Sequence, residues 1–142
     1  MTATEWNQKT IDAFHAQNGL GIPPWGDHVL LLTAKGAKSG ELHTTPLVYV
    51  RDGGNLVVIA SRGGAPADPT WFNNLRANPE VEVEVGKDGG IEKFKARAAV
   101  IAGGPEHLRL YAAATKVWPA FAEYQTKTSR VIPVVVLEPT RD

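Results

Sequence analysis

The chain has 142 residues, about the length of one domain, and its 43% hydrophobic and 21% charged residues are typical of a globular protein. Its 15 Lys and Arg residues balance its 15 Asp and Glu residues, so no overall positive field favours a nucleic acid or an anionic membrane. Cysteine is absent, which excludes disulfides, thiol nucleophiles, iron–sulfur clusters and thiolate zinc sites. Because neither a cationic leader nor a long apolar run is present, we expect a single cytoplasmic domain over residues 1–142.

The apolar residues of the first half predict a helix followed by three strands. The helix is expected over residues 2–18, because Trp6, Ile11 and Phe14 fall on one broad face. Three apolar runs are typical of strands, at residues 29–33, 43–50 and 56–60. The glycine-rich turn between the last two runs favours a hairpin, so we expect an antiparallel meander.

The second half predicts three helices and three further strands. The helices are expected over residues 69–77, from 105 to a break at Pro119, and then to about 126, with Asp68 capping the first. The strands are expected over residues 80–85, 94–100 and 132–137, the last stopped by Glu138-Pro139. Val and Glu alternate over 80–85, so the valines should point inward and the glutamates into solvent, opposite lysines of the next strand.

These elements together predict a mainly β, α+β fold. Six strands of mostly antiparallel type, with helices between pairs of them, are typical of a small closed or split β-barrel with flanking helices. No internal repeat or low-complexity tract interrupts the chain.

Two short loops rich in glycine and cations are candidate anion sites. Lys35-Gly36-Ala37-Lys38-Ser39-Gly40 joins two strands, and its glycines allow backbone N–H groups to face a phosphate. Ser61-Arg62-Gly63-Gly64 precedes a helix N-terminus, where positive partial charge gathers. Each loop is also explained as an ordinary solvated connection. Their recurrence at the ends of neighbouring strands favours a ligand with separated anionic groups.

A third candidate is aromatic. Trp118, Phe121 and Tyr124 are spaced by three, so on a helix they share one side. Such a stripe usually belongs to a core, but a planar ligand would use the same surface, with the Tyr124 hydroxyl as a donor. Trp71 and Phe72 admit the same two interpretations.

Several enzyme classes are excluded by the other polar residues. No serine lies in a GxSxG motif, and the four histidines have no metal-ligand spacing, so no metal is expected. The glutamates of the alternating strand face solvent in this interpretation, which argues against paired-acid glycosidase chemistry. A pocket without a strong acid, base or nucleophile set is typical of an enzyme whose cofactor supplies the chemistry.

Several motifs, in a fixed order between residues 28 and 139, resemble the deazaflavin (F420)-dependent nitroreductase family. They are LLLT at 30–33, GAKSG at 36–40, TTPL at 44–47, SRGGAP at 61–66, WFNNL at 71–75, ANP at 77–79 and IPVVV at 132–136. The resemblance implies a split β-barrel that binds coenzyme F420. It also implies hydride transfer from the reduced deazaflavin to an electrophilic acceptor, such as a quinone, an enone or a nitroaromatic.

The resemblance assigns roles to residues of this chain by position. The contacts to the coenzyme's phosphate and oligoglutamate tail fall on Lys38, Ser39, Gly40, His43, Thr44, Thr45 and Pro46. The contacts to the deazaflavin ring fall on Ser61, Arg62, Gly63, Gly64, Trp71 and Asn74. The helix with Trp118, Phe121 and Tyr124 would cover the acceptor. Tyr124 and Ser61 are the candidate catalytic proton donors, with solvent as an alternative.

Two positions depart from the family's pattern. Ala37 and His43 stand where the family often has Arg, so tail binding should be weaker or depend more on Lys35 and Arg62.

Two alternatives to an F420-dependent oxidoreductase also remain: a non-catalytic protein that carries F420 or FMN, and an FMN-dependent relative of the same barrel. We expect a small-molecule electron acceptor, no nucleic acid partner, and a monomer or homodimer. Whether the N-terminal helix contacts the periphery of a membrane stays open.

Overall fold

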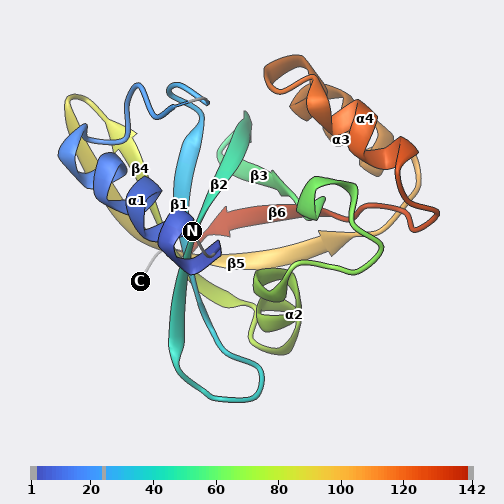
Figure 1. Cartoon of the computed structure of the whole chain (residues 1–142), viewed down its shortest axis with the longest axis horizontal. Helices are drawn as coiled ribbons and strands as arrows, with labels where there is room; N and C mark the ends of the chain where they lie inside the picture. The colour runs from blue at the N-terminus through green and yellow to red at the C-terminus, as the bar shows by residue number, and fades with distance from the viewer. Residues whose placement is uncertain (1–2, 24, 141–142) are drawn as a thin grey trace.

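Six antiparallel strands close into one barrel (Figure 1). The computed structural model describes residues 3–23 and 25–140. The strands are β1 (Val29–Lys35), β2 (Leu42–Asp52), β3 (Asn55–Ile59), β4 (Glu80–Lys87), β5 (Gly90–Ile101) and β6 (Val134–Pro139). Their order around the barrel is β1-β2-β3-β6-β5-β4, and every neighbouring pair is antiparallel. The predicted barrel and its first meander are confirmed.

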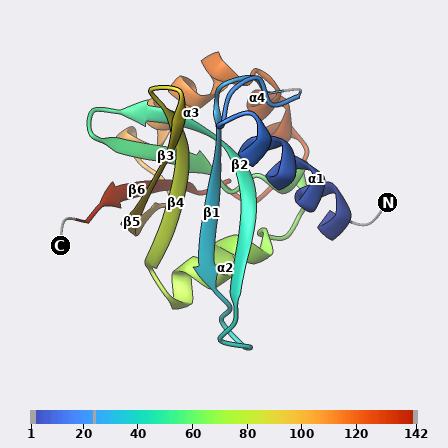
Figure 2. The same ribbon diagram turned by 90° about the vertical axis from the view of Figure 1, so that its left-hand side faces the viewer.

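Four helices flank the barrel on three sides. They are α1 (Ala3–Ala16), α2 (Thr70–Ala77), α3 (Pro105–Val117) and α4 (Ala120–Thr126), with a short 3-10 helix, η1, at Arg62–Gly64. Figures 1 and 2 show α1 beside β1 and β2, α2 below the barrel, and the pair α3 and α4 on another side. The predicted helix over residues 2–18 agrees with α1, although Thr2 and the side chain of Trp6 lie outside the described part. No helix in residues 3–23 and 25–140 is long and apolar enough to cross a membrane.

The alternation of side chains along the strands divides the core into layers. One cluster draws buried residues from all six strands and is completed by Trp71, Phe72 and Leu75 of α2, which therefore plug one end of the barrel. A second cluster lies between strands β2, β3 and β6 and the helices α3 and α4. A third lies under α1, where Phe14 is fully buried against Leu31 of β1. The apolar residues on the outward faces of the strands explain why helices cover them.

Strand β4 has the alternation that its sequence predicts. Val81, Val83 and Val85 are buried, and their neighbours pair with lysines, as in the Lys93–Glu82 ion pair of 3.7 Å. The expectation that every glutamate stands in solvent is wrong at Glu84. That side chain is 18% exposed and lies 3.2 Å from His15 Nε2, because α1 packs over this part of the barrel.

The predicted ends of β5 and β6 need correction. Strand β6 includes Glu138 and Pro139, which the sequence suggested would stop it. Its ladder continues because Pro139 lies opposite Ala96 and the next residue, Thr140, donates its N–H to the carbonyl of Lys95 at 2.9 Å. Val100 alternates with the inward-facing Phe94, Ala96 and Ala98 in the sequence but is 40% exposed, since there β5 pairs with β6 after its ladder with β4 has ended at Arg97.

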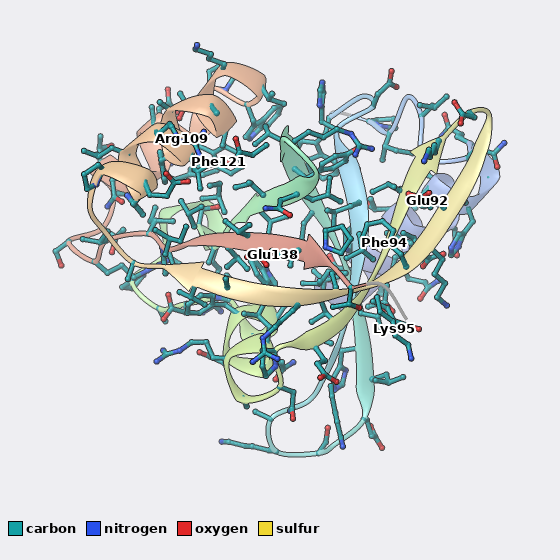
Figure 3. The ribbon with its side chains drawn as sticks, turned by 180° about the vertical axis from the view of Figure 1, so that it is seen from behind. Glu92, Phe94, Lys95, Arg109, Phe121 and Glu138 are labelled. Carbon is teal, nitrogen blue, oxygen red and sulfur yellow. The ribbon has the colours of Figure 1, made fainter. Side chains whose placement is uncertain are left out.

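A surface ion pair fixes α3 to the β2–β3 turn. Arg109 donates two hydrogen bonds to the carboxylate of Asp52, at 2.9 and 3.0 Å. The Arg109 guanidinium holds the pKa of the Asp52 carboxyl below its usual value, mainly through these bonds. Figure 3 shows Arg109 near Phe121 on the α3–α4 side, away from Glu92 and Phe94 of β5.

Two leucines of α3 provide a matched test of the packing. Leu110 is 1% exposed between α3 and the barrel, whereas Leu108 is 70% exposed on the same helix. Leu110→Ala should lower the free energy of unfolding by about 2–5 kcal/mol. Leu108→Ala should change it by about 0.5 kcal/mol or less. Urea unfolding followed by circular dichroism measures both, and equal losses would contradict this placement of α3.

Candidate active site

An aromatic pocket of about 440 Å³ opens between the barrel wall and helices α2 and α4. Five aromatic side chains line it, Trp25, Trp71, Trp118, Phe121 and Tyr124. Strand β2 supplies a further wall with Thr45, Pro46, Leu47 and Val48. Polar groups enter from Ser61, Arg62, Thr70 and Asn7. A concave, mainly apolar site with a few convergent polar groups is typical of a small-molecule pocket.

The pocket continues into a polar groove. A second cavity of about 570 Å³ shares Asn7, Thr45, Thr70 and Trp71 with the aromatic pocket, so the two are parts of one site. Away from the shared residues, the groove is lined by Gln8, Ile11, Leu42, His43, Thr44 and Asn74. The combined site therefore extends from α4 across β2 toward the β1–β2 loop.

The β1–β2 loop is held by two asparagines of the α2 region. Asn74, which is 6% exposed, accepts the N–H of Ala37 at its Oδ1 atom at 3.1 Å. Asn78 donates its Nδ2–H to the carbonyl of Lys35 at 3.3 Å. The structure thus gives Asn74 a role in fixing this loop as well as a place in the groove lining.

The predicted tail residues divide into two groups. His43, Thr44 and Thr45 line the polar groove, and Pro46 lines the aromatic pocket. In contrast, Lys38, Ser39 and Gly40 lie exposed in the β1–β2 loop and line neither cavity. Ser39 Oγ accepts the N–H of Glu41 at 3.2 Å, which shapes the turn. Lys38 is thus an exposed cation on the loop that follows β1.

The loop after β3 forms the 3-10 helix η1 and contacts α4. Ser61 is 7% exposed and lines the aromatic pocket, as does Arg62, which has a positive φ of 47°. Gly64 has a φ of 84°, and a Cβ atom there would lie 2.7 Å from the carbonyl oxygen of Tyr124. Its missing side chain therefore permits contact with α4. The assignment of Gly64 to the coenzyme ring stays a prediction.

The three residues of the predicted aromatic triad all line the pocket. Trp118 lies just before α4, and Phe121 and Tyr124 lie on it. Trp118 donates its indole N–H to the hydroxyl oxygen of Tyr124 at 3.4 Å and packs edge-on against Trp25, with ring centroids 6.4 Å apart. Phe121 is 5% exposed and packs edge-on against Tyr124. Behind them Tyr111 donates its hydroxyl hydrogen to the carbonyl of Phe121, and burial raises the pKa of the Tyr111 phenol. The triad is therefore both core and pocket wall.

Arg130 is a polar residue near the site that the sequence did not single out. Its side chain, 17% exposed, lies 3.0 Å from the carboxylate of Asp68. The expected helix cap by Asp68 is therefore wrong: α2 begins after Pro69 with no side-chain cap, and Asp68 pairs with Arg130. Neither residue is near the other in sequence, so only the fold brings them together.

Asn7 and Trp25 were also missed as lining residues. Asn7 reaches both cavities from α1, and Trp25 reaches the aromatic pocket from the turn-rich crossing between α1 and β1. The sequence carried no signal for Asn7, because the position of α1 on the barrel decides it. A tryptophan in a turn rich in glycine and proline was the one available hint for Trp25.

A family model, curated relatives and a solved structure of 38% identity indicate one family. The sequence model described as F420H2-dependent quinone reductase matches residues 6–139. An F420H2-dependent quinone reductase of Mycobacterium tuberculosis is 40% identical over 119 residues, which are 82% of this chain and 74% of that protein. A solved F420-H2 dependent reductase is 38% identical with a TM-score of 0.69, covering 78% of this chain and 94% of the other. A solved domain-swapped dimer is 32% identical with a TM-score of 0.71, covering 96% and 100%.

The contact between Gly64 and α4 can be tested against a second glycine. Gly53 also has a positive φ, of 61°, but nothing lies within 4 Å of a Cβ placed there. Gly53→Ala should cost about 1–2 kcal/mol of stability, from the left-handed backbone alone. Gly64→Ala should cost about 1–3 kcal/mol more, because the methyl group collides with the α4 backbone. Denaturant unfolding of both variants measures the difference, and equal costs would contradict the close approach.

Proposed function

Because the chain belongs to the F420H2-dependent quinone reductase family, we propose that its aromatic pocket holds the deazaflavin ring of reduced coenzyme F420 beside a quinone acceptor. The coenzyme is the hydride donor of this family of oxidoreductases. The lining of the pocket supports the proposal. Trp25, Trp71 and Trp118 form planar apolar walls, and few of the other lining residues are polar. Such a lining fits a planar ring system and a second planar molecule.

The polar groove fits the anionic tail of the coenzyme. His43 and Thr44 line it, and the exposed Lys38 stands on the loop beyond. Hydroxyl groups, backbone N–H groups and a cation are the partners that phosphate and carboxylate groups require. Neither His43 nor Ala37 supplies the fixed charge of an arginine at its position. We therefore assign Lys38, Ser39, Gly40, His43, Thr44, Thr45 and Pro46 to the tail, with Lys38 as the principal charge.

The proposed chemistry needs little from the protein beyond placement and proton delivery. Reduced F420 supplies the hydride, and the quinone takes up that hydride and a proton. The tryptophans orient the two planar molecules and exclude water from the space between them. The hydroxyl oxygen of Tyr124 accepts a hydrogen bond from Trp118, which leaves the Tyr124 proton available for the quinone oxygen. Ser61, also on the pocket wall, is the second candidate donor.

Ligand binding and turnover test this function and separate it from the two alternatives. The purified protein is titrated with oxidised F420 and with FMN, and coenzyme fluorescence is followed. The complex with reduced F420 is then mixed rapidly with menadione. We expect micromolar binding of F420 and oxidation that depends on menadione. Binding without oxidation would indicate a carrier, and binding of FMN alone would indicate an FMN-dependent relative.

Lys38 provides a test of the tail assignment. Lys38→Ala should weaken F420 binding by about 1.5–3 kcal/mol, the range of a hydrogen bond to a charged group, and more so at low salt. Affinity for a truncated deazaflavin without the anionic tail should stay unchanged. Lys116→Ala, on α3, removes an equal charge away from the groove and should leave F420 affinity unchanged. Equal affinity in the Lys38 variant would move the phosphate contact elsewhere.

Tyr124 provides a test of proton delivery. Tyr124→Phe should lower kcat with menadione about 100-fold, the lower range for a general acid, while F420 affinity stays within about twofold. Tyr111→Phe is the matched control, because that hydroxyl donates to the carbonyl of Phe121 and does not line the pocket. An unchanged kcat in the Tyr124 variant would reduce its hydroxyl to a packing role.

Location in the cytoplasm and the absence of a nucleic acid partner stay predictions from the sequence.

A further inference from the structure

Arg130 binds the loop between β3 and α2 at four acceptors. Its Nε–H donates to the carbonyl of Ala65 at 2.9 Å, and one terminal nitrogen lies 3.0 Å from Asp68 Oδ1. The other terminal nitrogen donates to the carbonyls of Ala60 and Ser61, at 3.2 and 2.9 Å. Figure 1 shows the segment before β6 beside this loop. The planar fork of a guanidinium can satisfy several acceptors at once, which a lysine ammonium does less well.

Arg130 adds a side-chain anchor to a loop whose own backbone bonds are short turns, from the Gly64 N–H to the Ser61 carbonyl and from the Ala65 N–H to the Arg62 carbonyl. Arg62 has a left-handed φ of 47°, which is unfavourable for a residue with a side chain. The residues whose carbonyls Arg130 binds include Ala60, fully buried, and Ser61, 7% exposed. Without Arg130 both carbonyls would lose a charge-assisted donor in a place that water reaches poorly, and the Ser61 carbonyl would keep the Gly64 N–H. Opening the loop to water would replace the lost bonds.

The loop anchored in this way also forms part of the aromatic pocket. Ser61 and Arg62 line the pocket, whereas Arg130 does not. The segment that carries Arg130 is itself held to α4, because Gln125 donates to the carbonyl of Arg130 at 2.7 Å and accepts the N–H of Ile132 at 2.9 Å. Arg130 therefore connects the wall with Ser61 to the helix with Tyr124.

We propose that Arg130 is a positioning residue that keeps the Ser61–Arg62 wall of the pocket in its coenzyme-binding conformation. This inference rests on the proposed function for its ligand, but its structural part concerns the free protein. If the loop held that conformation one-tenth of the time, the apparent Kd for F420 would rise about tenfold. The hydroxyl of Tyr124 would still face the acceptor, so kcat at saturating coenzyme would fall less than binding.

Amide hydrogen exchange in the free protein tests the structural part. The N–H groups of Gly64 and Ala65 donate to the carbonyls of Ser61 and Arg62, at 2.9 and 3.1 Å, and so report whether the loop is closed. In Arg130→Met both amides should exchange at least about tenfold faster, because the open state becomes populated. Arg130→Lys should give an intermediate rate, since lysine keeps the charge opposite Asp68 but lacks the fork. Amides of β4 should exchange as in the unaltered protein.

The same variants are titrated with oxidised F420 and assayed with menadione. Arg130→Met should raise Kd about tenfold and change kcat at saturating F420H2 by about threefold or less. Arg109→Met is the matched control, because it removes an arginine whose hydrogen bonds go to the carboxylates of Asp52 and Glu106 and not to the loop between β3 and α2. It should leave Gly64 exchange and F420 affinity unchanged.

Defined outcomes would overturn the inference. Wild-type exchange and wild-type F420 affinity in Arg130→Met would do so, as would equal effects in Arg109→Met, which would indicate general destabilisation. Should Arg130→Met fail to fold, exchange at Gly64 in Arg130→Lys decides the question, and an unaltered rate rejects the anchor. If the unaltered protein fails to bind F420, the proposed function falls, whereas the exchange experiment still decides whether Arg130 holds the loop.

Discussion

The barrel depends on a narrow seam between β1 and β4. Only three register pairs join these strands, Leu31 with Glu84, Leu32 with Val83 and Thr33 with Glu82, whereas eight join β4 to β5. Helix α1 covers this seam, with Phe14 buried against Leu31 and His15 beside Glu84. Closure removes the free strand edges that an open sheet would leave. It also gives every strand an inner and an outer face, and the helices that build the site pack on those outer faces or plug the barrel end.

The site exists because separate helices meet at one stretch of wall. Strand β2 passes under the end of α1 and near α2 and α4, so Thr45 and Pro46 lie where three helices converge. The residues between β3 and α2 fill the remaining side, and Gly64 allows them to touch the α4 backbone. The core and the pocket lining thus use the same side chains. Phe121 is almost fully buried in the outer core and still lines the pocket, so its replacement would affect both stability and the shape of the pocket.

Patterns within one segment of the sequence predicted the features that depend on neighbouring residues alone. The alternation of Val and Glu over 80–85 was enough to orient β4, and the glycine turn between β2 and β3 was enough to place their hairpin. Pro139 did not stop β6, because the ladder with β5 continues through it. The loops at 36–40 and 61–64 and the aromatic triad stood out as candidates, because charge, glycine and spacing by three are visible in one segment. Ser61, Arg62 and the triad line the aromatic pocket. How Lys38 and Gly63 contact a ligand stays a prediction.

The failures have a common cause, which is competition from residues distant in sequence. Asp68 has the chemistry of a helix cap, but Arg130 offers it a stronger, charge-assisted partner. Glu84 alternates like an exposed residue, but α1 covers it and brings His15 alongside. Asn7 joins the lining only because α1 packs against β2 at that point. Tertiary packing, which no single segment encodes, decided each of these positions.

The tryptophans give the molecule an optical property of its own. Three of the four in the chain, Trp25, Trp71 and Trp118, line the aromatic pocket. Most of the indole emission of the folded protein therefore arises beside a single cavity. A conjugated molecule that entered this cavity would lie close enough to quench the tryptophan fluorescence. The intrinsic fluorescence of the unlabelled protein would therefore report whether the cavity is occupied.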